Sequence, residues 1–341
     1  MIRFLTIRIL QAIPVLFIMS VITFTIINAP PGDYADYIRG NMISQGGASL
    51  ETATAAAEAY RERHGLNDPI YIQYFRWIGG ILFEGNFGHS FFYNKPVADV
   101  VAERLPATIA IALVCHFFAS LFGISFGILA ATRQYSWTDT FLSFVAFMGM
   151  TIPRFLLALI ILYILAFQLN VQELGSFYSS RYGGQPFWLG WFDFNWAKLW
   201  NLIQHVWPVI FIATFGGLAY NMRVMRGNLL DTLNAQYVEA ARAKGLSEGA
   251  VVMKHAVPNA LHPLVAYQGV IMPYMLTGEI EVAIVFGLAT VGPAIVGSMS
   301  IGDVYVTATL LLVLGATLII GNIIADMMLA LLDPRIRVGN D

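Results

Sequence analysis

The side chains with the clearest potential for chemistry lie in one polar, helix-forming segment of the second half of the chain, residues 223–262. Its centre holds Glu239, followed by the small residues Ala240 and Ala241 and then by Gly245. A short helix of this composition presents a charge beside small side chains, so another protein surface can approach it closely. The pattern therefore favours non-covalent docking rather than the making or breaking of bonds.

The residues around Glu239 are expected to form a helix followed by a sharp turn. Residues 235–244 are good helix formers, and Glu239 lies three residues before Arg242, a spacing that permits local pairing on a helix. Gly245 adopts the left-handed conformation that commonly ends helices. The sequence therefore predicts that the first helix of the segment ends at Gly245.

A second short helix is predicted directly after this turn. Ser247 is a preferred capping residue, and Glu248 would then lie in the first turn, where the helix dipole favours a negative charge. Pro258 and Pro263 are expected to end this helix and to lead back into an apolar stretch. An ordinary solvated loop is the alternative, but such a loop would need neither two capped helices nor the small residues.

Three other charged residues, Arg154, Glu279 and Glu281, lie in or beside apolar stretches. An arginine at the centre of a membrane helix costs roughly 2.5–3.5 kcal/mol, so such side chains usually face a cavity or pair with one another. They are therefore candidates for lining a solute path. Two alternatives stay open: Arg154 forms a structural bridge with a glutamate, or the glutamates lie in water outside the membrane.

The remaining residues give little support for enzymatic chemistry. The sequence has no His-Glu-x-x-His spacing and no cysteine cluster, so no metal site is expected, and Cys115 is expected to be a small buried side chain. It also has no Gly-x-x-x-x-Gly-Lys-Ser/Thr phosphate loop. No cofactor is therefore expected in this chain, and any ATP must be hydrolysed on another subunit.

The composition indicates a membrane protein. Hydrophobic residues make up 57% of the 341 residues and charged residues only 12%, roughly half the usual share of charge. A soluble protein of this size could not bury so much apolar surface, so most of it is expected to face lipid. The net charge of -2 gives no basic face for neutralising phosphates, which argues against a nucleic-acid partner.

The first 30 residues are expected to form the N-terminus and the first transmembrane helix. Residues 10–29 supply the roughly 20 apolar residues that span a bilayer. A cleaved signal peptide is the alternative, but its apolar core would be shorter. The more polar region 31–104 is expected to be an extracytoplasmic helical region, with helices over residues 49–64, 69–83 and 97–104.

The rest of the chain, residues 105–341, is expected to form a five-helix core with the polar segment 223–262 as a cytoplasmic loop. The apolar stretches cover residues 105–132, 140–170, 199–222, 263–278 and 304–325, and Asp303 is placed to cap the last one. The stretch 140–170 contains Pro153 and fits either two short spans or one long, kinked span.

Basic residues decide this topology, because they gather on the cytoplasmic side of membranes. Arg8, Arg133, the 223–262 segment and Arg335 share one side only if residues 140–170 form a single, proline-kinked span. The sequence therefore predicts an all-α integral membrane protein with six transmembrane helices and both termini in the cytoplasm.

The pattern Glu239-Ala240-Ala241-x-x-x-Gly245, with Pro258 thirteen residues later, resembles the EAA motif of ABC-importer permeases. Further resemblance to the dipeptide/oligopeptide permease family covers nearly the whole chain. It lies in Pro31-Gly32-Asp33, His64-Gly65-Leu66, Glu103-Arg104-Leu-Pro106-Ala-Thr and Asp333-Pro334-Arg335-Ile336-Arg337.

The resemblance implies the type I permease fold of ABC importers in a bacterial inner membrane. It also implies three kinds of partner besides lipid: a homologous second permease, two ATPase subunits that carry ATP and Mg, and an extracytoplasmic solute-binding protein. Within residues 235–258, the Glu239 region would dock in a groove of one ATPase. Gly245 would set the turn.

One stretch departs from the commonest pattern of that family. Residues 278–293 lack its usual Pro-Gly-Leu-Gly turn, and together with Pro30-Pro31-Gly32-Asp33-Tyr34 they look more like members that import oligosaccharides. The expected function is therefore a permease subunit for a peptide- or oligosaccharide-sized solute. The alternatives are a proton-coupled secondary transporter and an intramembrane enzyme using Arg154, Glu279 and Glu281.

Overall fold

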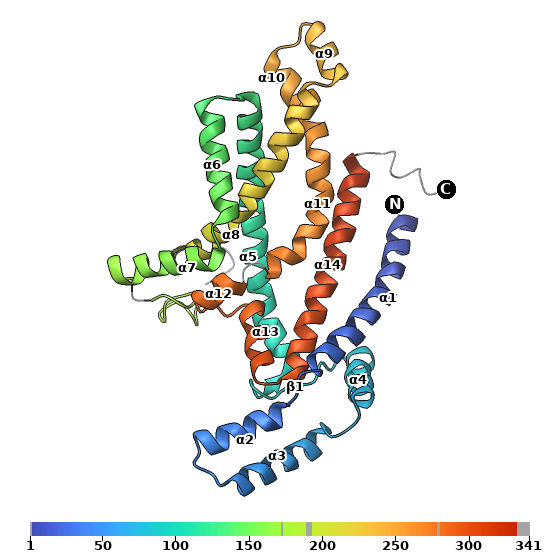
Figure 1. The fold of residues 1–341 in the computed structure, drawn as a ribbon, viewed down its shortest axis with the longest axis vertical. Coiled ribbons are helices and arrows are strands. Elements are labelled where there is room, and N and C mark those ends of the chain that lie inside the picture. The colour runs from blue at the N-terminus through green and yellow to red at the C-terminus, as the bar shows by residue number, and fades with distance from the viewer. Residues whose placement is uncertain (1, 172, 189–192, 278–279, 333–341) are drawn as a thin grey trace. The chain divides into compact units, whose positions relative to one another are not determined.

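The computed structural model describes residues 2–171, 173–188, 193–277 and 280–332 of the chain (Figure 1). It is predominantly helical, as the sequence predicts. The chain forms two compact units, each assembled from segments that are distant in sequence. The first unit comprises residues 1–107 and 290–319, and the second comprises residues 108–289 and 320–341.

The first unit contains short helices around the ends of two long ones. Its elements are α1 (Ile2–Ile27), α2 (Tyr34–Ser44), α3 (Leu50–His64), α4 (Ile70–Gly79), the π-helical turn η1 (Gly80–Glu84), β1 (His89–Ser90), β2 (Lys95–Pro96), the start of α5 (Val97–Thr132), α13 (Val291–Ser300) and the first half of α14 (Val304–Leu332). The strands β1 and β2 pair antiparallel. The predicted region 31–104 therefore packs as one body with the first helix and with residues 290–319.

The helix predicted over residues 49–64 is confirmed as α3. Ser49 caps its N-terminus by accepting a hydrogen bond from Thr52 N, and Gly65 ends it with φ +64°. Sequence reasoning missed α2, although Asp33 and Asp36 form a reciprocal capping box at its start. The signal was present, because an acidic residue three positions after an Asp cap is a typical helix start.

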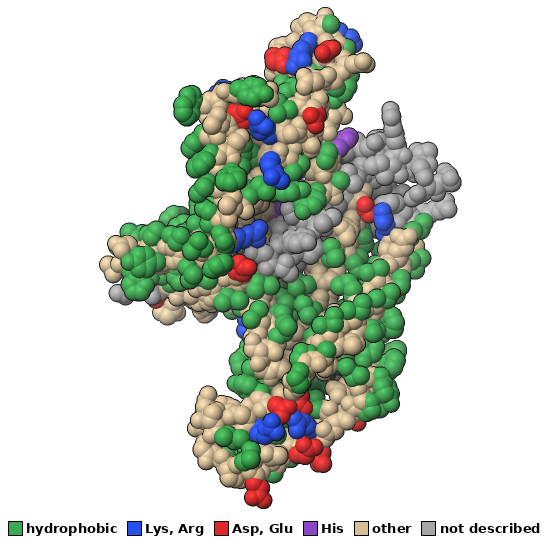
Figure 2. Space-filling model, in the orientation of Figure 1, with side chains coloured by type: hydrophobic (Ala, Val, Ile, Leu, Met, Phe, Trp, Pro, Cys, Tyr) green, Lys and Arg blue, Asp and Glu red, His purple; other side chains and the backbone are tan. Residues whose placement is uncertain are grey.

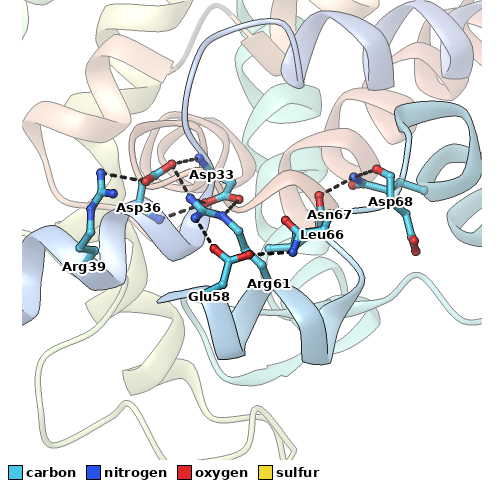
Figure 3. Close-up of polar contacts among 9 residues, drawn as sticks. Asp33, Asp36, Arg39, Glu58, Arg61, Leu66, Asn67 and Asp68 are labelled. Carbon is cyan, nitrogen blue, oxygen red and sulfur yellow. Dashed lines mark hydrogen bonds and ion pairs between the residues drawn. The ribbon is translucent and has the colours of Figure 1, made fainter. Parts of the chain in front are cut away.

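Arg61 of α3 joins the first two short helices (Figure 3). Its guanidinium donates to both carboxylate oxygens of Asp33, at 2.7 and 3.0 Å, and it also contacts Asp36 at 2.9 Å and Glu58 at 3.2 Å. Burial alone would raise the pKa of Asp36, but its hydrogen bond with Arg61 and the nearby Arg39 lower the pKa below its ordinary value. The network fixes α2 against α3.

Asp303 caps the last long helix, as predicted, and also holds the β-hairpin. Its carboxylate accepts from Val306 N at 3.4 Å, from the Ser90 hydroxyl at 2.7 Å and from Phe92 N at 3.1 Å. The side chain is fully buried, and this burial raises its pKa despite the three hydrogen bonds. The chain between β1 and β2 is thereby tied to α14.

A separate surface helix over residues 97–104 does not form. These residues are the first turns of α5, which continues through Pro106 without a break. Val97 and Val100 are fully buried and hold these turns in place. A proline inside a helix removes a hydrogen bond and crowds the preceding turn, which is why the sequence predicted a boundary, but α5 tolerates Pro106.

The second unit is built around the long helix α8. Its elements are the rest of α5, α6 (Trp137–Thr151), α7 (Arg154–Tyr163), the π-helical turn η2 (Ile164–Gln168), α8 (Trp196–Leu233), α9 (Gln236–Ala243), α10 (Glu248–Val251), the π-helical turn η3 (Val252–Ala256), α11 (Val257–Thr277), α12 (Ile280–Val285) and the end of α14. Residues of α5, α7, α8 and α12 share one apolar core, which includes Val209, Ile212 and Phe286.

The stretch 140–170 is broken at Pro153. Helix α6 ends at Thr151, and α7 with η2 continues at an angle of 97° to it. The residue before a proline is pushed out of the helical conformation, and Ile152 accordingly has ψ 122°. The interruption is confirmed but is far sharper than a kink, and a single crossing by both halves stays a prediction.

Among the described residues, four helices are long and apolar enough to cross a membrane, or five spans if the bent pair counts as one. They are Thr6–Ile27, Val97–Thr132, Trp196–Leu233 and Val304–Ile324. The predicted fifth span corresponds to α11, which has 21 residues but contains proline, histidine and glutamine. Six spans therefore stay a prediction, whereas the all-α membrane architecture is confirmed.

Candidate coupling site

Helix α9 presents one face to the protein and the other to solvent. Val238 is fully buried and Ala241 is 6% exposed, whereas Glu239, Ala240 and Ala243 are exposed. The buried face packs in an apolar cluster whose other buried members are Ala131, Met225, Leu229, Val251, Val252, Ala256, Val257, Ala260 and Leu264. This cluster joins α9, α10, η3 and the neighbouring ends of α8 and α11, so these short helices pack together as one unit on the ends of α8 and α11.

The turn after α9 has the predicted geometry. Gly245 has φ +79°, and its backbone N–H donates to Arg242 O at 2.9 Å. A Cβ at this position would meet no atom within 4 Å, so the backbone conformation alone requires glycine. Ser247 occupies the N-cap of α10, but its side chain makes no capping hydrogen bond, contrary to the prediction.

Arg242 pairs across the turn with Glu248. Its Nε and Nη2 donate to the two carboxylate oxygens at 3.1 and 2.8 Å, and its Nη1 donates to Leu233 O at 3.2 Å. The hydrogen bonds from Arg242 lower the pKa of Glu248. Arg242 therefore stabilises the turn instead of pairing with Glu239. The turn brings Glu248 of α10 within hydrogen-bonding distance of the Arg242 guanidinium. Glu239 is exposed on the outer face.

Pro258 does not end a helix, contrary to the prediction. Helix α10 continues through the π-helical turn η3 into α11, and Pro258 lies exposed in the first turn of α11. A proline cannot donate a backbone hydrogen bond to the preceding turn. A π-helical turn directly before it changes the hydrogen-bond register and accommodates the missing donor.

The outer surface of the segment mixes apolar and charged side chains. Tyr237, Leu246 and Met253 are 46%, 43% and 56% exposed, beside the exposed Ala240 and Ala243. Figure 2 shows positive and negative side chains close together over α9 and α10. Exposed apolar side chains with interspersed charge are suited to binding another protein surface.

This surface connects directly to the long helices of its unit. Helix α8 leads into α9 through only two residues, and Asn228 of α8 donates to Ala260 O of α11 at 3.2 Å. The segment is therefore joined directly to both α8 and α11.

Close packing extends this connection to α5. A Cβ at Gly127 of α5 would lie 2.7 Å from Met225 Cβ and 2.8 Å from Met222 O, and one at Gly123 would lie 2.6 Å from Asn221 Cβ. The two glycines therefore let the backbones of α5 and α8 approach closely, as small residues do in membrane bundles.

Helix α6 is joined to α8 by an ion pair. Arg226 Nε and Nη2 donate to the two oxygens of Asp139 at 2.7 and 2.8 Å, and Asp139 also accepts from Tyr135 N at 3.0 Å. The Asp139 side chain is 6% exposed and that of Arg226 is 28% exposed. Sequence reasoning missed this pair, because Asp139 and Arg226 are distant in sequence and nothing near either one indicates its partner.

The three charged candidates for a solute path are placed differently. Arg154 is half-buried at the start of α7, and its guanidinium lies against α8, where a Cβ on Gly216 would be 3.1 Å from Arg154 Nε. Glu281 is exposed in the first turn of α12. Glu279 lies outside the described residues. The structure thus brings Arg154 to α8 and leaves a pairing with either glutamate as a prediction.

Among the described residues, four membrane-length helices occur together with an exposed helix–turn–helix that connects α8 to α11, and these features define a multi-helix membrane protein. The fold is similar to that of a chain in the solved inward-facing MetNI methionine ABC transporter. The TM-score is 0.52 at 17% sequence identity, and the match covers 69% of this chain and 96% of that chain. The type I permease fold expected from the sequence agrees with this similarity.

The chain belongs to the family of binding-protein-dependent transport system inner membrane components. Residues 123–338 match that family, and residues 1–112 match the N-terminal region of such components. It is 32% identical to the oligopeptide transport system permease protein AppB of Bacillus subtilis (strain 168), over 97% of this chain and 98% of AppB. It is 33% identical to a protein of Brucella abortus (strain 2308) named as a peptide transport system permease, over 97% of each.

These matches confirm the predicted function at the level of the family. The chain is a non-catalytic permease subunit of an ABC importer and a multi-pass protein of the inner membrane. The resemblance seen in the EAA-type pattern of residues 239–245 was therefore a correct indication of the class.

Proposed function

We propose that this chain forms half of the translocation path for a peptide-sized solute and pairs with a homologous second permease. The names of the relatives support a peptide, since both AppB and the Brucella abortus protein are named for peptide transport. An oligosaccharide is the alternative, supported by residues 278–293 and by the Pro30-Pro31-Gly32 turn. An extracytoplasmic binding protein would deliver the solute.

The segment 235–258 would dock on one of two ATPase subunits, which hold ATP and Mg. The observation that carries this proposal is the rigid, exposed helix–turn–helix: Glu239 and Ala240 face outward, while Val238 anchors the helix inward. Glu239 would meet a basic residue of the ATPase. Closure of the ATPase dimer would then move α8 and α11 together and open the path alternately to the two sides.

Arg154, Glu279 and Glu281 would line the path. The half-buried position of Arg154 against α8 supports this role, because α8 is the helix that the docking segment moves most directly. The docking segment and both termini would lie in the cytoplasm, which the preference of basic residues for that side supports, as it does for Arg8 and Arg133.

The docking proposal is tested by filling the small-residue face. Ala240→Trp adds bulk at an exposed position, so the fold is retained while the approach of the ATPase is blocked. Ala59→Trp on α3, in the predicted extracytoplasmic region, is the matched control at another exposed alanine. The expected result is loss of ATPase co-purification and of uptake for Ala240→Trp alone. Retention of both by Ala240→Trp would refute the docking site.

The solute is tested through the binding protein encoded beside the gene of this permease. Titration with peptides and with oligosaccharides, followed by calorimetry, is expected to show binding of peptides only. Binding of oligosaccharides without peptides would overturn the peptide assignment and leave the docking proposal intact.

A further inference from the structure

Helix α4 and the turn η1 form a short helical arm with two apolar faces, not one. The inner face packs on the end of α1: Tyr74 and Trp77 are 7% and 3% exposed and contact Phe24. The rings of Phe24 and Trp77 stack with centroids 5.3 Å apart, and those of Phe24 and Tyr74 meet edge to face at 5.6 Å. These contacts fix the arm against α1 (Figure 1).

A hydrogen bond sets the depth of this arm along α1. The hydroxyls of Tyr74 and Ser20 are 2.8 Å apart, and Ser20 is buried at 1% exposure. Phe24 and Ser20 precede Ile27, the last residue of α1, by about 5 and 11 Å along the axis at a rise of roughly 1.5 Å per residue. The arm therefore lies level with the last apolar turns of α1 and not beyond them.

The outer face of the arm is apolar and exposed. Tyr71, Phe75, Leu82 and Phe83 are 61%, 64%, 69% and 86% exposed, and they extend along both α4 and η1. The one basic residue of the arm, Arg76, pairs with Asp68 just before it. The exposed Glu84 ends the arm directly after Phe83. Exposed apolar side chains grouped in this way usually mark a surface that binds another protein or a membrane.

We propose that the arm is an interfacial lipid anchor, with Tyr71, Phe75, Leu82 and Phe83 inserted among the lipids of the leaflet in which α1 ends. Lipid is the occupant that fits, because the arm packs on α1, whose membrane window is only 11% buried. Figure 2 shows hydrophobic side chains over much of the surface around α1. The depths of Phe24 and Ser20 also bracket the roughly 5–10 Å to which interfacial helices enter a bilayer. Tyrosine is enriched at this level of membranes.

The anchor is tested in the complete transporter reconstituted in phosphatidylcholine vesicles. Nitroxide labels are attached at Phe75→Cys or Phe83→Cys in a Cys115→Ala background, and Glu62→Cys on the exposed face of α3 is the matched control. Collision rates with oxygen, which concentrates in lipid, and with a neutral nickel chelate, which stays in water, are then measured. The circular dichroism spectrum and gel-filtration profile of each labelled variant, compared with those of the wild type, report retention of the fold.

The expected result is an oxygen-to-nickel ratio several-fold higher at Phe75 and Phe83 than at Glu62. A ratio equal to that at Glu62 would overturn the proposal, because the arm would then lie in water. Low accessibility to both reagents would overturn it as well, because another protein would then cover the face. The measurement depends on neither the solute nor ATP, so failure of the proposed cargo or docking would leave its outcome unchanged.

Discussion

Gly245 provides a sharp test of the docking segment, because its requirement for glycine comes from the backbone alone. Gly245→Ala places an L side chain at φ +79°, where no neighbouring atom lies within 4 Å of the new Cβ. The left-handed conformation costs roughly 1–2 kcal/mol for such a residue. If the turn of the Gly245→Ala variant relaxes in the free permease and must regain its shape on docking, this energy weakens docking by about 5- to 30-fold.

Gly249→Ala is the matched control for this change. Gly249 lies in α10 of the same segment, is exposed, also has no atom within 4 Å of a new Cβ, and does not adopt a positive φ. Alanine is favoured over glycine in a helix by up to about 1 kcal/mol, so this variant is expected to be neutral or slightly stabilising.

The assay is ATP-dependent uptake by the reconstituted complex, measured with ATP hydrolysis over a range of ATPase-subunit concentrations. Gly245→Ala is expected to need more ATPase subunit for half-maximal uptake, while Gly249→Ala matches the wild type. Equal behaviour of the two variants would refute the claim that the left-handed turn at Gly245 positions the docking surface.

Three further changes follow from the packing of each unit. Gly127→Ala is expected to lower the thermal unfolding temperature in detergent, because overpacking against α8 costs about 1–3 kcal/mol. Gly227→Ala, whose new Cβ would meet open space, is expected to leave that temperature unchanged or to raise it. Equal losses in the two variants would contradict the close approach of α5 and α8. Asp139→Asn is expected to cost about 2 kcal/mol of stability in the same assay. This is less than the roughly 3–5 kcal/mol for breaking a fully buried ion pair, because Arg226 is partly exposed. No loss of stability would contradict a stabilising ion pair between Asp139 and Arg226. Arg61 lowers the pKa of Asp36 in the folded state, so the stability from Asp36 is present above the ordinary pKa of 3.8 and is lost as the pH falls through the lower folded value. Arg61→Gln is expected to flatten the dependence of the unfolding temperature on acid pH. An unchanged slope would contradict this contribution of Arg61.

The docking segment could be predicted from sequence because its determinants are local. Helix formers followed by Gly245 define a helix and a turn within a few residues, and the same holds for Ser49 and Gly65 at the two ends of α3. Local rules failed around Pro258, because two backbone conformations are compatible with a proline there: the helix can end, or a π-helical turn can precede the proline. A π-helical turn absorbs the missing donor, and no local pattern distinguishes that solution from a helix end.

The contacts between distant segments could not be predicted. Arg226 reaches Asp139 across 87 residues, and Ser90 reaches Asp303 across 213. The sequence shows that each side chain is polar within an apolar chain, but its partner depends on the packing of whole helices. The glycines of α5 are similar, since Gly127 becomes significant only when α8 lies against it.

The central claim is that ATP hydrolysis on a partner moves solute through this permease by way of residues 235–258. The most direct measurement is solute uptake into vesicles holding the complete transporter and its binding protein, with either Mg-ATP or an imposed proton gradient. The account predicts uptake only with hydrolysable ATP, and none with the gradient alone. Uptake driven by the gradient in the absence of ATP would contradict it.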